Sequence, residues 1–329
     1  MPDRAKALFL ATLLLAGTRA LASAPEPLDV LAVYTDAAAD RYAGAPVPRI
    51  EHLAAVADDV FARSGVPLAL RLAAVEATTL GPVAETPATL ERLTLGDDPA
   101  AVAVRARRDA IGADVVVLFS SYAGDGYCGV TWLGGTRTPG VLDARDRDHG
   151  YAVVALDCGA YTLVHELGHL LGLVHSRREV PGGGTEPWAA GHGVDGRFTT
   201  VMAPADSFGA PRLPQLSDPD RRACFGEPCG VPGEDPVAGA HAVRTVLATA
   251  PQLVAYRTPP SAIAPTAEAP AAAASRPLAE GSGSAARDPA SAPATAGGGC
   301  AVGAAHDDPT LPLLLAVALA WQLRCRPAA

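Results

Sequence analysis

Three histidines and one glutamate stand at a spacing that suits a metal centre. In the segment YTLVHELGHLLGLVH, His165 and His169 are four residues apart, so a helix presents both imidazoles on one face. Glu166 lies beside the first histidine, within reach of a water molecule on the metal that the histidines bind. Gly172 can adopt a positive φ, which ends the helix and returns the chain so that His175 supplies a third ligand.

This ligand set predicts a catalytic zinc site. Three neutral imidazoles leave a fourth zinc position for water, whereas a structural site is normally closed by four protein ligands. Zinc lowers the pKa of such a water to about 7, and Glu166 is expected to take its proton as general base and deliver it to the leaving amine of a peptide bond. The rival interpretation is a surface-displayed binding or adhesion module in which zinc is only structural. A second signal is Met202 in TTVMAP, because it is the only methionine besides Met1.

The residues around the motif alternate between strand and helix patterns. Short apolar runs predict buried strands, and apolar residues at helical spacing predict helices. The predicted strands span residues 29–34, 67–75, 114–119, 128–133 and 151–156, and the predicted helices span residues 50–63 and 98–111. The acidic run at 143–148 is interpreted as a solvated loop. Strands separated by helices indicate one α/β domain with a mostly parallel sheet.

Composition excludes several mechanisms. Of 26 basic residues only Lys6 is a lysine, so a chain that loses its N-terminus has no Schiff-base lysine, phosphate-loop lysine or lysine base. The net charge of −9 argues against nucleic acid and anionic membrane surfaces as general partners. We expect protein or peptide substrates and a monomeric protein.

The two ends of the chain predict an exported protein. Residues 1–22 have the charged start, short apolar core and small-residue cleavage site of a signal peptide. Residues 258–299 predict a disordered linker rich in Pro, Ala, Ser and Gly. Residues 300–329, with an apolar transmembrane segment at 311–323, resemble bacterial C-terminal sorting tags of the MYXO-CTERM and JDVT-CTERM kind, and a plain membrane anchor is the alternative. The expected location is the cell surface or outer membrane of a Gram-negative bacterium, or the medium after release.

Four cysteines lie between these ends, and export places them in an oxidising compartment. Four cysteines allow three pairings. We favour Cys224–Cys229, which closes a short loop, together with Cys128–Cys158. Zinc binding by the four cysteines is the rival interpretation, but the sequence has no Cys-x-x-Cys spacing among them.

The string from His165 to His175, followed by the Val-Met-x-Pro turn at Met202, resembles the metzincin zinc endopeptidases. Within that clan the chain resembles the bacterial reprolysin-like enzymes, including the peptidyl-Asp metallopeptidases, over residues 28–257. The resemblance implies an α/β fold with a twisted five-stranded mixed sheet, an active-site helix beneath it and a smaller C-terminal subdomain. It also implies Zn²⁺ as cofactor and Met202 as the apolar floor under the histidines.

The substrate is expected to lie antiparallel along the strand at 128–133, because an unpaired strand edge binds extended peptides without regard to sequence. The residues of this edge are Gly129, Val130, Thr131 and Trp132. Cleavage before acidic residues, which the peptidyl-Asp resemblance implies, needs a basic pocket, and Arg197 and Arg212 lie on the segments that flank Met202. The remaining histidines lack ligand spacing and are assigned structural or solvent-exposed roles: His52, His149, His192, His241 and His306.

Overall fold

The structure, a computed structural model, describes residues 27–257 and 299–303. The elements that build the main sheet and its helices are β1 (Leu28–Tyr34), α1 (Asp36–Arg41), α2 (Val47–Arg63), β2 (Leu70–Ala77), α3 (Thr86–Leu95), α4 (Pro99–Ile111), β3 (Val115–Ser120), β4 (Tyr127–Trp132), α5 (Ala144–Asp148), β5 (Tyr151–Ala155) and α6 (Thr162–Leu170). The smaller elements that follow are β6 (Val174–Ser176), β7 (Ala190–Gly191), β8 (Gly193–Val194), β9 (Phe198–Thr199), α7 (Ala205–Phe208), α8 (Ala242–Leu253) and β10 (Gly299–Gly303).

The main sheet has the strand order β10-β4-β5-β3-β1-β2. β1 pairs in parallel with both β2 and β3, β3 pairs in parallel with β5, and β4 runs antiparallel to β5. Strands β1 to β5 therefore form the five-stranded mixed α/β sheet that was predicted. β10 adds a sixth strand, parallel to β4, with Ala301 opposite Val130 and Val302 opposite Thr131. The edge of β4 is thus paired in this structure, which corrects the expectation of an open edge.

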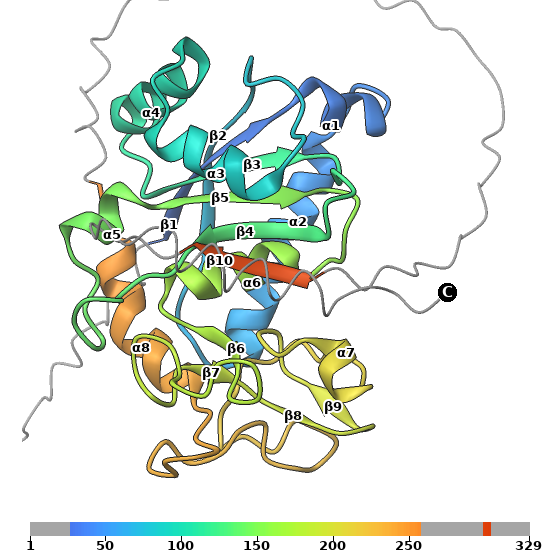
Figure 1. The fold of residues 1–329 in the computed structure, drawn as a ribbon, viewed down its shortest axis with the longest axis vertical. Helices are drawn as coiled ribbons and strands as arrows, with labels where there is room; N and C mark the ends of the chain where they lie inside the picture. The colour runs from blue at the N-terminus through green and yellow to red at the C-terminus, as the bar shows by residue number, and fades with distance from the viewer. Residues whose placement is uncertain (1–26, 258–298, 304–329) are drawn as a thin grey trace, which may run out of the picture.

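Helices cover both faces of the sheet. Figure 1 shows α3 and α4 above the sheet and α6 below it, with α2 running beside α6. β3 and β5 are buried along their whole length, because helices on both faces exclude water from a central parallel strand. Local signals delimit α4: the Asp98 carboxylate caps the amide of Ala101, and Gly112 ends the helix with φ +67°.

A single buried carboxylate joins the beginning and the end of the domain. Asp114, directly before β3, accepts hydrogen bonds from the backbone amides of Asp29 (2.9 Å) and Arg257 (3.1 Å). The side chain is almost wholly buried. Burial raises the pKa of Asp114 to about 6, although the two amide donors oppose that rise.

The remaining elements form the smaller C-terminal subdomain. β6 to β9 and α7 lie below α6 in Figure 1, and α8 runs beside them. The acidic run at 143–148 is helical rather than a loop, because Asp143 and Asp146 form a reciprocal capping box at the start of α5. Every helix in residues 27–257 is too short or too polar to cross a membrane. The predicted signal peptide, linker and segment 311–323 lie outside the described residues, apart from Gly299 of the linker.

Candidate metal centre

Helix α6 carries two of the three predicted ligands and the predicted base. All nine of its residues are buried, so the helix lies inside the domain rather than on its surface. Leu163, Val164 and Leu167 supply apolar packing around it. The i,i+4 spacing places His165 and His169 against each other, with ring centroids 4.7 Å apart.

The turn after α6 brings in the third histidine. Gly172 has φ +89°, the left-handed conformation that was predicted for it. A Cβ on Gly172 would also lie 2.5 Å from Cγ2 of Thr185, so the position is restricted by space as well as by conformation. The chain then returns as β6, and the His175 ring lies 5.1 Å from the ring of His165 and 5.0 Å from that of His169.

Hydrogen bonds fix the tautomers of the two helical histidines. Nδ1 of His165 donates to the carbonyl oxygen of Val201 at 3.0 Å, and Nδ1 of His169 donates to that of Leu173 at 2.7 Å. A carbonyl oxygen can only accept, so each Nδ1 carries the proton of its ring. In the neutral rings both Nε2 atoms then present lone pairs, and these two atoms lie 3.1 Å apart.

This arrangement fits a divalent metal. Two lone pairs at 3.1 Å repel each other unless a cation lies between them. Two nitrogens bound to a tetrahedral zinc at about 2.0 to 2.1 Å lie about 3.3 Å apart, close to the observed spacing. Nε2 of His175 is buried without a hydrogen-bond partner among the described residues, as expected of a third ligand atom. The three ligand nitrogens lie within 4.8 Å of one another.

The electrostatics of the site keep the imidazoles neutral. Burial lowers the pKa of His165 and His169 well below the usual value, and the neighbouring rings lower it further. Burial lowers the pKa of His175 to about 4. Neutral imidazoles are the form that binds metal, so the site is ready for a cation at neutral pH.

Glu166 lies against the backbone of β4. Its side chain has no exposed surface. A Cβ built on Gly129 would lie 2.5 Å from Oε1 of Glu166 and 2.8 Å from its Cδ and Cγ. Gly129 was predicted only as a residue of the substrate edge, and the structure shows that it also provides the space for this carboxylate. The other residues of that edge, Val130, Thr131 and Trp132, are buried in β4.

Met202 lies beneath the helix at a point where the helix has no side chain. It is fully buried, and a Cβ on Gly168 would collide with its sulfur atom. The preceding residue, Val201, holds the His165 ring through its carbonyl oxygen. The turn at Met202 therefore packs against α6, and through Val201 it orients one of the ligands. Gly168 was not singled out from the sequence, although a glycine inside a helix is a signal of close approach.

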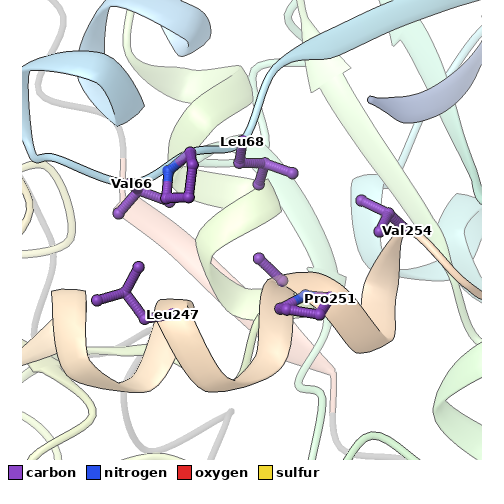
Figure 2. Close-up of a pocket in the computed structure, with 7 residues that line it drawn as sticks. Val66, Leu68, Leu247, Pro251 and Val254 are labelled. Carbon is purple, nitrogen blue, oxygen red and sulfur yellow. The ribbon is translucent and has the colours of Figure 1, made fainter. Parts of the chain in front are cut away.

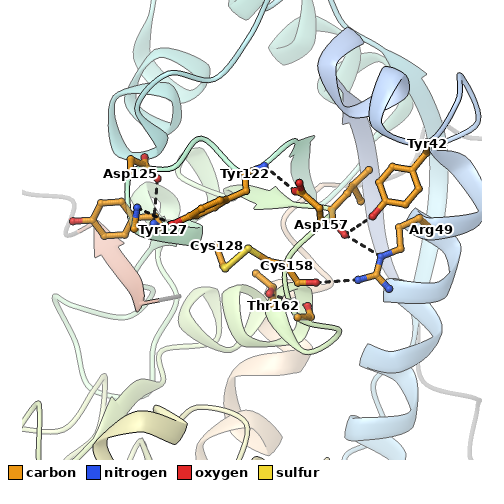
Figure 3. Close-up of a disulfide and its surroundings, with 12 residues drawn as sticks. Tyr42, Arg49, Tyr122, Asp125, Tyr127, Cys128, Asp157, Cys158 and Thr162 are labelled. Carbon is orange, nitrogen blue, oxygen red and sulfur yellow. Dashed lines mark hydrogen bonds between the residues drawn. A yellow bond between two sulfur atoms is a disulfide. The ribbon is translucent and has the colours of Figure 1, made fainter. Parts of the chain in front are cut away.

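Both favoured disulfides form. Cys128–Cys158 links β4 to the loop before α6, with Cα atoms 5.7 Å apart, and Cys224–Cys229 closes a short loop with Cα atoms 5.2 Å apart. Figure 3 shows how the first disulfide is surrounded by hydrogen bonds to the same loop. Arg49 donates to the carbonyl of Cys158 at 3.2 Å, and Asp157 accepts from the amide of Tyr122 at 2.8 Å. The disulfide links β4 to the loop before α6, and these bonds link the same loop to α2 and to the β3–β4 connection.

The two arginines near Met202 have different environments. Arg197 forms an exposed ion pair with Glu227. Arg212 is half-buried, and its Nε has no hydrogen-bond partner among the described residues.

His241, predicted to be isolated, lies 3.6 Å from Asp218 and close to Asp220. Arg221 is 3.8 Å from the same Asp218 carboxylate, and its positive charge opposes the binding of a cation there.

A separate hollow in the fold lacks groups that could do chemistry. It has a volume of about 320 Å³ and lies between the α2–β2 connection and α8. Figure 2 shows its apolar lining, which includes Val66, Leu68, Leu247 and Val254. None of the three histidines lines this hollow, so the metal centre is the candidate site.

Comparison with known proteins agrees with this geometry. A peptidyl-Asp metalloendopeptidase of Pseudomonas aeruginosa is 33% identical over 77% of this chain and 44% of its own length. A protein of the same name from Xanthomonas campestris is 29% identical over 61% of this chain and 46% of its own length. The chain thus spans about half the length of these two relatives.

Similarity to solved structures extends to the fold. A protein in the structure of a chaperone–substrate complex superposes with a TM-score of 0.55 at 18% identity, over 71% of this chain and 36% of its own.

The family model of the reprolysin-like metallo-peptidases of family M12B matches residues 32–233, which include the three histidines, Glu166 and Met202. The chain therefore belongs to the reprolysin-like metallopeptidases of family M12B.

Proposed function

We propose that the protein is a zinc endopeptidase that hydrolyses peptide bonds of protein substrates. One observation carries the proposal: two buried Nε2 lone pairs face each other at 3.1 Å, the third Nε2 is buried without a partner in the described chain, and the buried Glu166 follows His165 on the same helix. The group of potential ligands around these nitrogens contains three histidines and no fourth protein residue within residues 27–257. A structural zinc site would be closed by a fourth ligand, so this count favours the enzyme over the binding module.

The residues of the chain have distinct roles in this mechanism. When bound, zinc supplies Lewis acidity, which acidifies water and polarises the scissile carbonyl. His165, His169 and His175 would hold it, and the carbonyls of Val201 and Leu173 keep the first two rings in the binding tautomer. Glu166 takes the proton of the attacking water on a carboxylate oxygen and delivers it to the leaving amine. Its buried position against β4 keeps bulk water from this proton transfer.

We propose that the substrate backbone adds to β4, in the place that β10 takes in this structure. An extended peptide there forms main-chain hydrogen bonds along Tyr127–Trp132, beside Glu166. β10 and substrate then compete for the same edge. Replacing Ala301 and Val302 by proline removes the one N–H group of this pair that can face β4, and it should lower KM by about fivefold, for a loss of about 1 kcal/mol of pairing. An unchanged KM in steady-state peptide kinetics would show that β10 does not compete.

The names of the relatives suggest a preference for aspartate, and we propose that this chain cleaves before acidic residues. We also propose that it is exported and tethered through its C-terminal region. The two disulfides support an oxidising location. We propose further that the protein is a monomer and that its C-terminal tag is processed.

Glu166→Gln in the full chain tests the mechanism. The amide is isosteric but cannot accept the proton, so kcat should fall by about 10²- to 10⁴-fold. Zinc content, measured by elemental analysis, should stay at that of the unmodified protein. Glu91→Gln on the exposed face of α3 is the matched control and should not change turnover. Near-normal turnover of Glu166→Gln, or activity that resists chelators, would refute the assignment.

A further inference from the structure

The third histidine depends on the turn that joins α6 to β6. Gly172 turns the chain at the end of α6, and three residues later the ring of His175 lies beside the rings of the two helical histidines. The position of the His175 ring therefore depends on the path that the backbone takes through this turn. Contacts that hold the turn also hold the third ligand.

The segment 184–191 runs beside the turn and contacts it closely. Thr185 donates its amide to the carbonyl of Gly172 at 2.8 Å, and Val174 donates its amide to the carbonyl of Ala189 at 2.9 Å. Thr185 is almost wholly buried, and a Cβ on Gly172 would lie 2.5 Å from its Cγ2 atom. The amide and the methyl group of this threonine thus both act on the turn.

The hydroxyl of Thr185 joins the turn to a second loop, which connects β4 to α5. It donates to the carbonyl of Gly135 at 2.8 Å and accepts from the amide of Gly140 at 2.9 Å. The same loop bonds the end of α6 directly, because the amide of Gly134 donates to the carbonyl of His169 at 3.0 Å. One buried hydroxyl therefore connects the turn before the third ligand to the loop that bonds the backbone of the second.

Helix α8 fixes this loop at two further points. Gln252 donates its side-chain amide to the carbonyl of Gly140 at 2.9 Å and accepts from the amide of Leu142 at 2.9 Å. Thr249, one turn earlier, donates its hydroxyl to the carbonyl of Leu171 at 2.9 Å. A ligand is held precisely only when the groups around it are themselves fixed. Because α8 fixes the loop, the threonine hydroxyl ties the turn to a rigid part of the domain.

We propose that Thr185 is a positioning residue of the metal centre, and that its hydroxyl keeps the Gly172 turn where it brings His175 to the metal. This inference rests on the proposed function, which requires zinc on the three histidines, and deepens it. A third ligand recruited from a looser turn loses more conformational entropy when it binds, so the metal is held less tightly. Groups that support metal ligands contribute about 10- to 100-fold to metal affinity or activity. Thr185 acts through the backbone, so we expect the lower end of this range.

The zinc affinity of the full chain, measured by competition with a chelator, tests this role. Thr185→Val keeps the shape of the side chain and removes the hydroxyl, so the dissociation constant for zinc should rise by about tenfold. Thr185→Ser keeps the hydroxyl and should keep most of the affinity.

Thr94→Val is the matched control. Thr94 is equally buried, and its hydroxyl also makes two hydrogen bonds: it donates to the carbonyl of Leu90 and accepts from the indole of Trp132. It lies on α3, on the face of the sheet opposite α6 (Figure 1). Thr94→Val should therefore lose stability as Thr185→Val does, but keep the zinc affinity of the unmodified protein.

The visible absorption of the protein loaded with Co²⁺ gives a second readout, because its bands depend on the geometry of the ligands. Thr185→Val should change these bands and Thr94→Val should not. If the unmodified protein binds zinc but cleaves no peptide, only the peptidase function is refuted, and weaker zinc binding by Thr185→Val still supports the inference.

Two results would overturn the inference: equal zinc affinities of Thr185→Val and Thr94→Val, or a Thr185→Ser variant that binds zinc as weakly as Thr185→Val. If Thr185→Val does not fold, Thr185→Ala is compared with Thr94→Ala in the same assay, because the smaller side chain leaves space in which water can bond the freed backbone groups. Equal zinc affinities of these two variants would overturn the inference in the same way.

Discussion

Replacing Gly129 by alanine adds one methyl group at the place where Glu166 packs against β4. The new Cβ would lie 2.5 Å from Oε1 of Glu166, and ordinary contact begins near 3.4 Å, so the carboxylate must move by about 0.9 Å. Misplacement of a catalytic group by about 1 Å can cost about 10²-fold in rate. Alanine is otherwise suited to a strand, where glycine costs about 0.5 to 1 kcal/mol. We therefore expect kcat/KM to fall by about 10²-fold without loss of fold.

Steady-state cleavage of a fluorogenic peptide measures this effect, with zinc content and thermal unfolding measured on the same samples. Gly159→Ala is the matched control, because a Cβ on Gly159 meets no atom within 4 Å. The control should keep full activity. Gly129→Ala with normal zinc and kcat/KM within threefold of the unmodified protein would refute the reasoning, since the carboxylate would then have tolerated the displacement or not have been the base.

Three other perturbations have expected outcomes. Removing zinc with a chelator should lower the melting temperature by several degrees, and adding zinc should restore it. A metal at 1,000 times its Kd contributes about 4 kcal/mol to the free energy of unfolding. An unchanged melting temperature in calorimetry would contradict a metal site in the folded state. Asp114 has a pKa raised to about 6 from 3.8, so the folded state keeps a proton that the unfolded state loses, and stability should fall by about 3 kcal/mol as pH rises through that window. Urea unfolding from pH 4 to 7 should show that fall for the unmodified protein and not for Asp114→Asn, and equal slopes would count against it. Serine replacement of Cys128 and Cys158, which are 30 residues apart, should cost about 4 kcal/mol against about 2 kcal/mol for Cys224 and Cys229, 5 apart, and chemical denaturation would expose a reversed order.

The parts of the fold that the sequence predicts well are those with local causes. Asp98 and Gly112 delimit α4 through a cap and a left-handed glycine, and both signals can be read within a few residues. The same holds for α6 and Gly172, whose conformation follows from the need to return the chain to His175. The capping box at Asp143 is equally local. An acidic run without the ligand spacing of a calcium loop favours a solvated loop, but the reciprocal bonds of Asp143 and Asp146 start a helix here.

The features that could not be predicted depend on residues far apart in the chain. The contact of Gly129 with Glu166 joins β4 to α6, and the relative position of these two elements depends on the sheet and on the Cys128–Cys158 disulfide. The addition of β10 to β4 brings together segments about 170 residues apart, which no local pattern indicates. Arg197 and Arg212 are equivalent in the sequence, and in the structure they differ by the ion pair of Arg197 with Glu227 and by the deeper burial of Arg212.

The carboxylate of Asp114 has a consequence for how the domain carries load. Because it accepts from the amide of Asp29 near the start of the fold and from the amide of Arg257 just after α8, these two segments of the chain meet at one point. A force applied between the flanking segments, or a partner domain fused to either of them, therefore also acts on the two hydrogen bonds that join backbone amides to this carboxylate. The three histidines lie on α6 and β6, outside the two segments that these hydrogen bonds join.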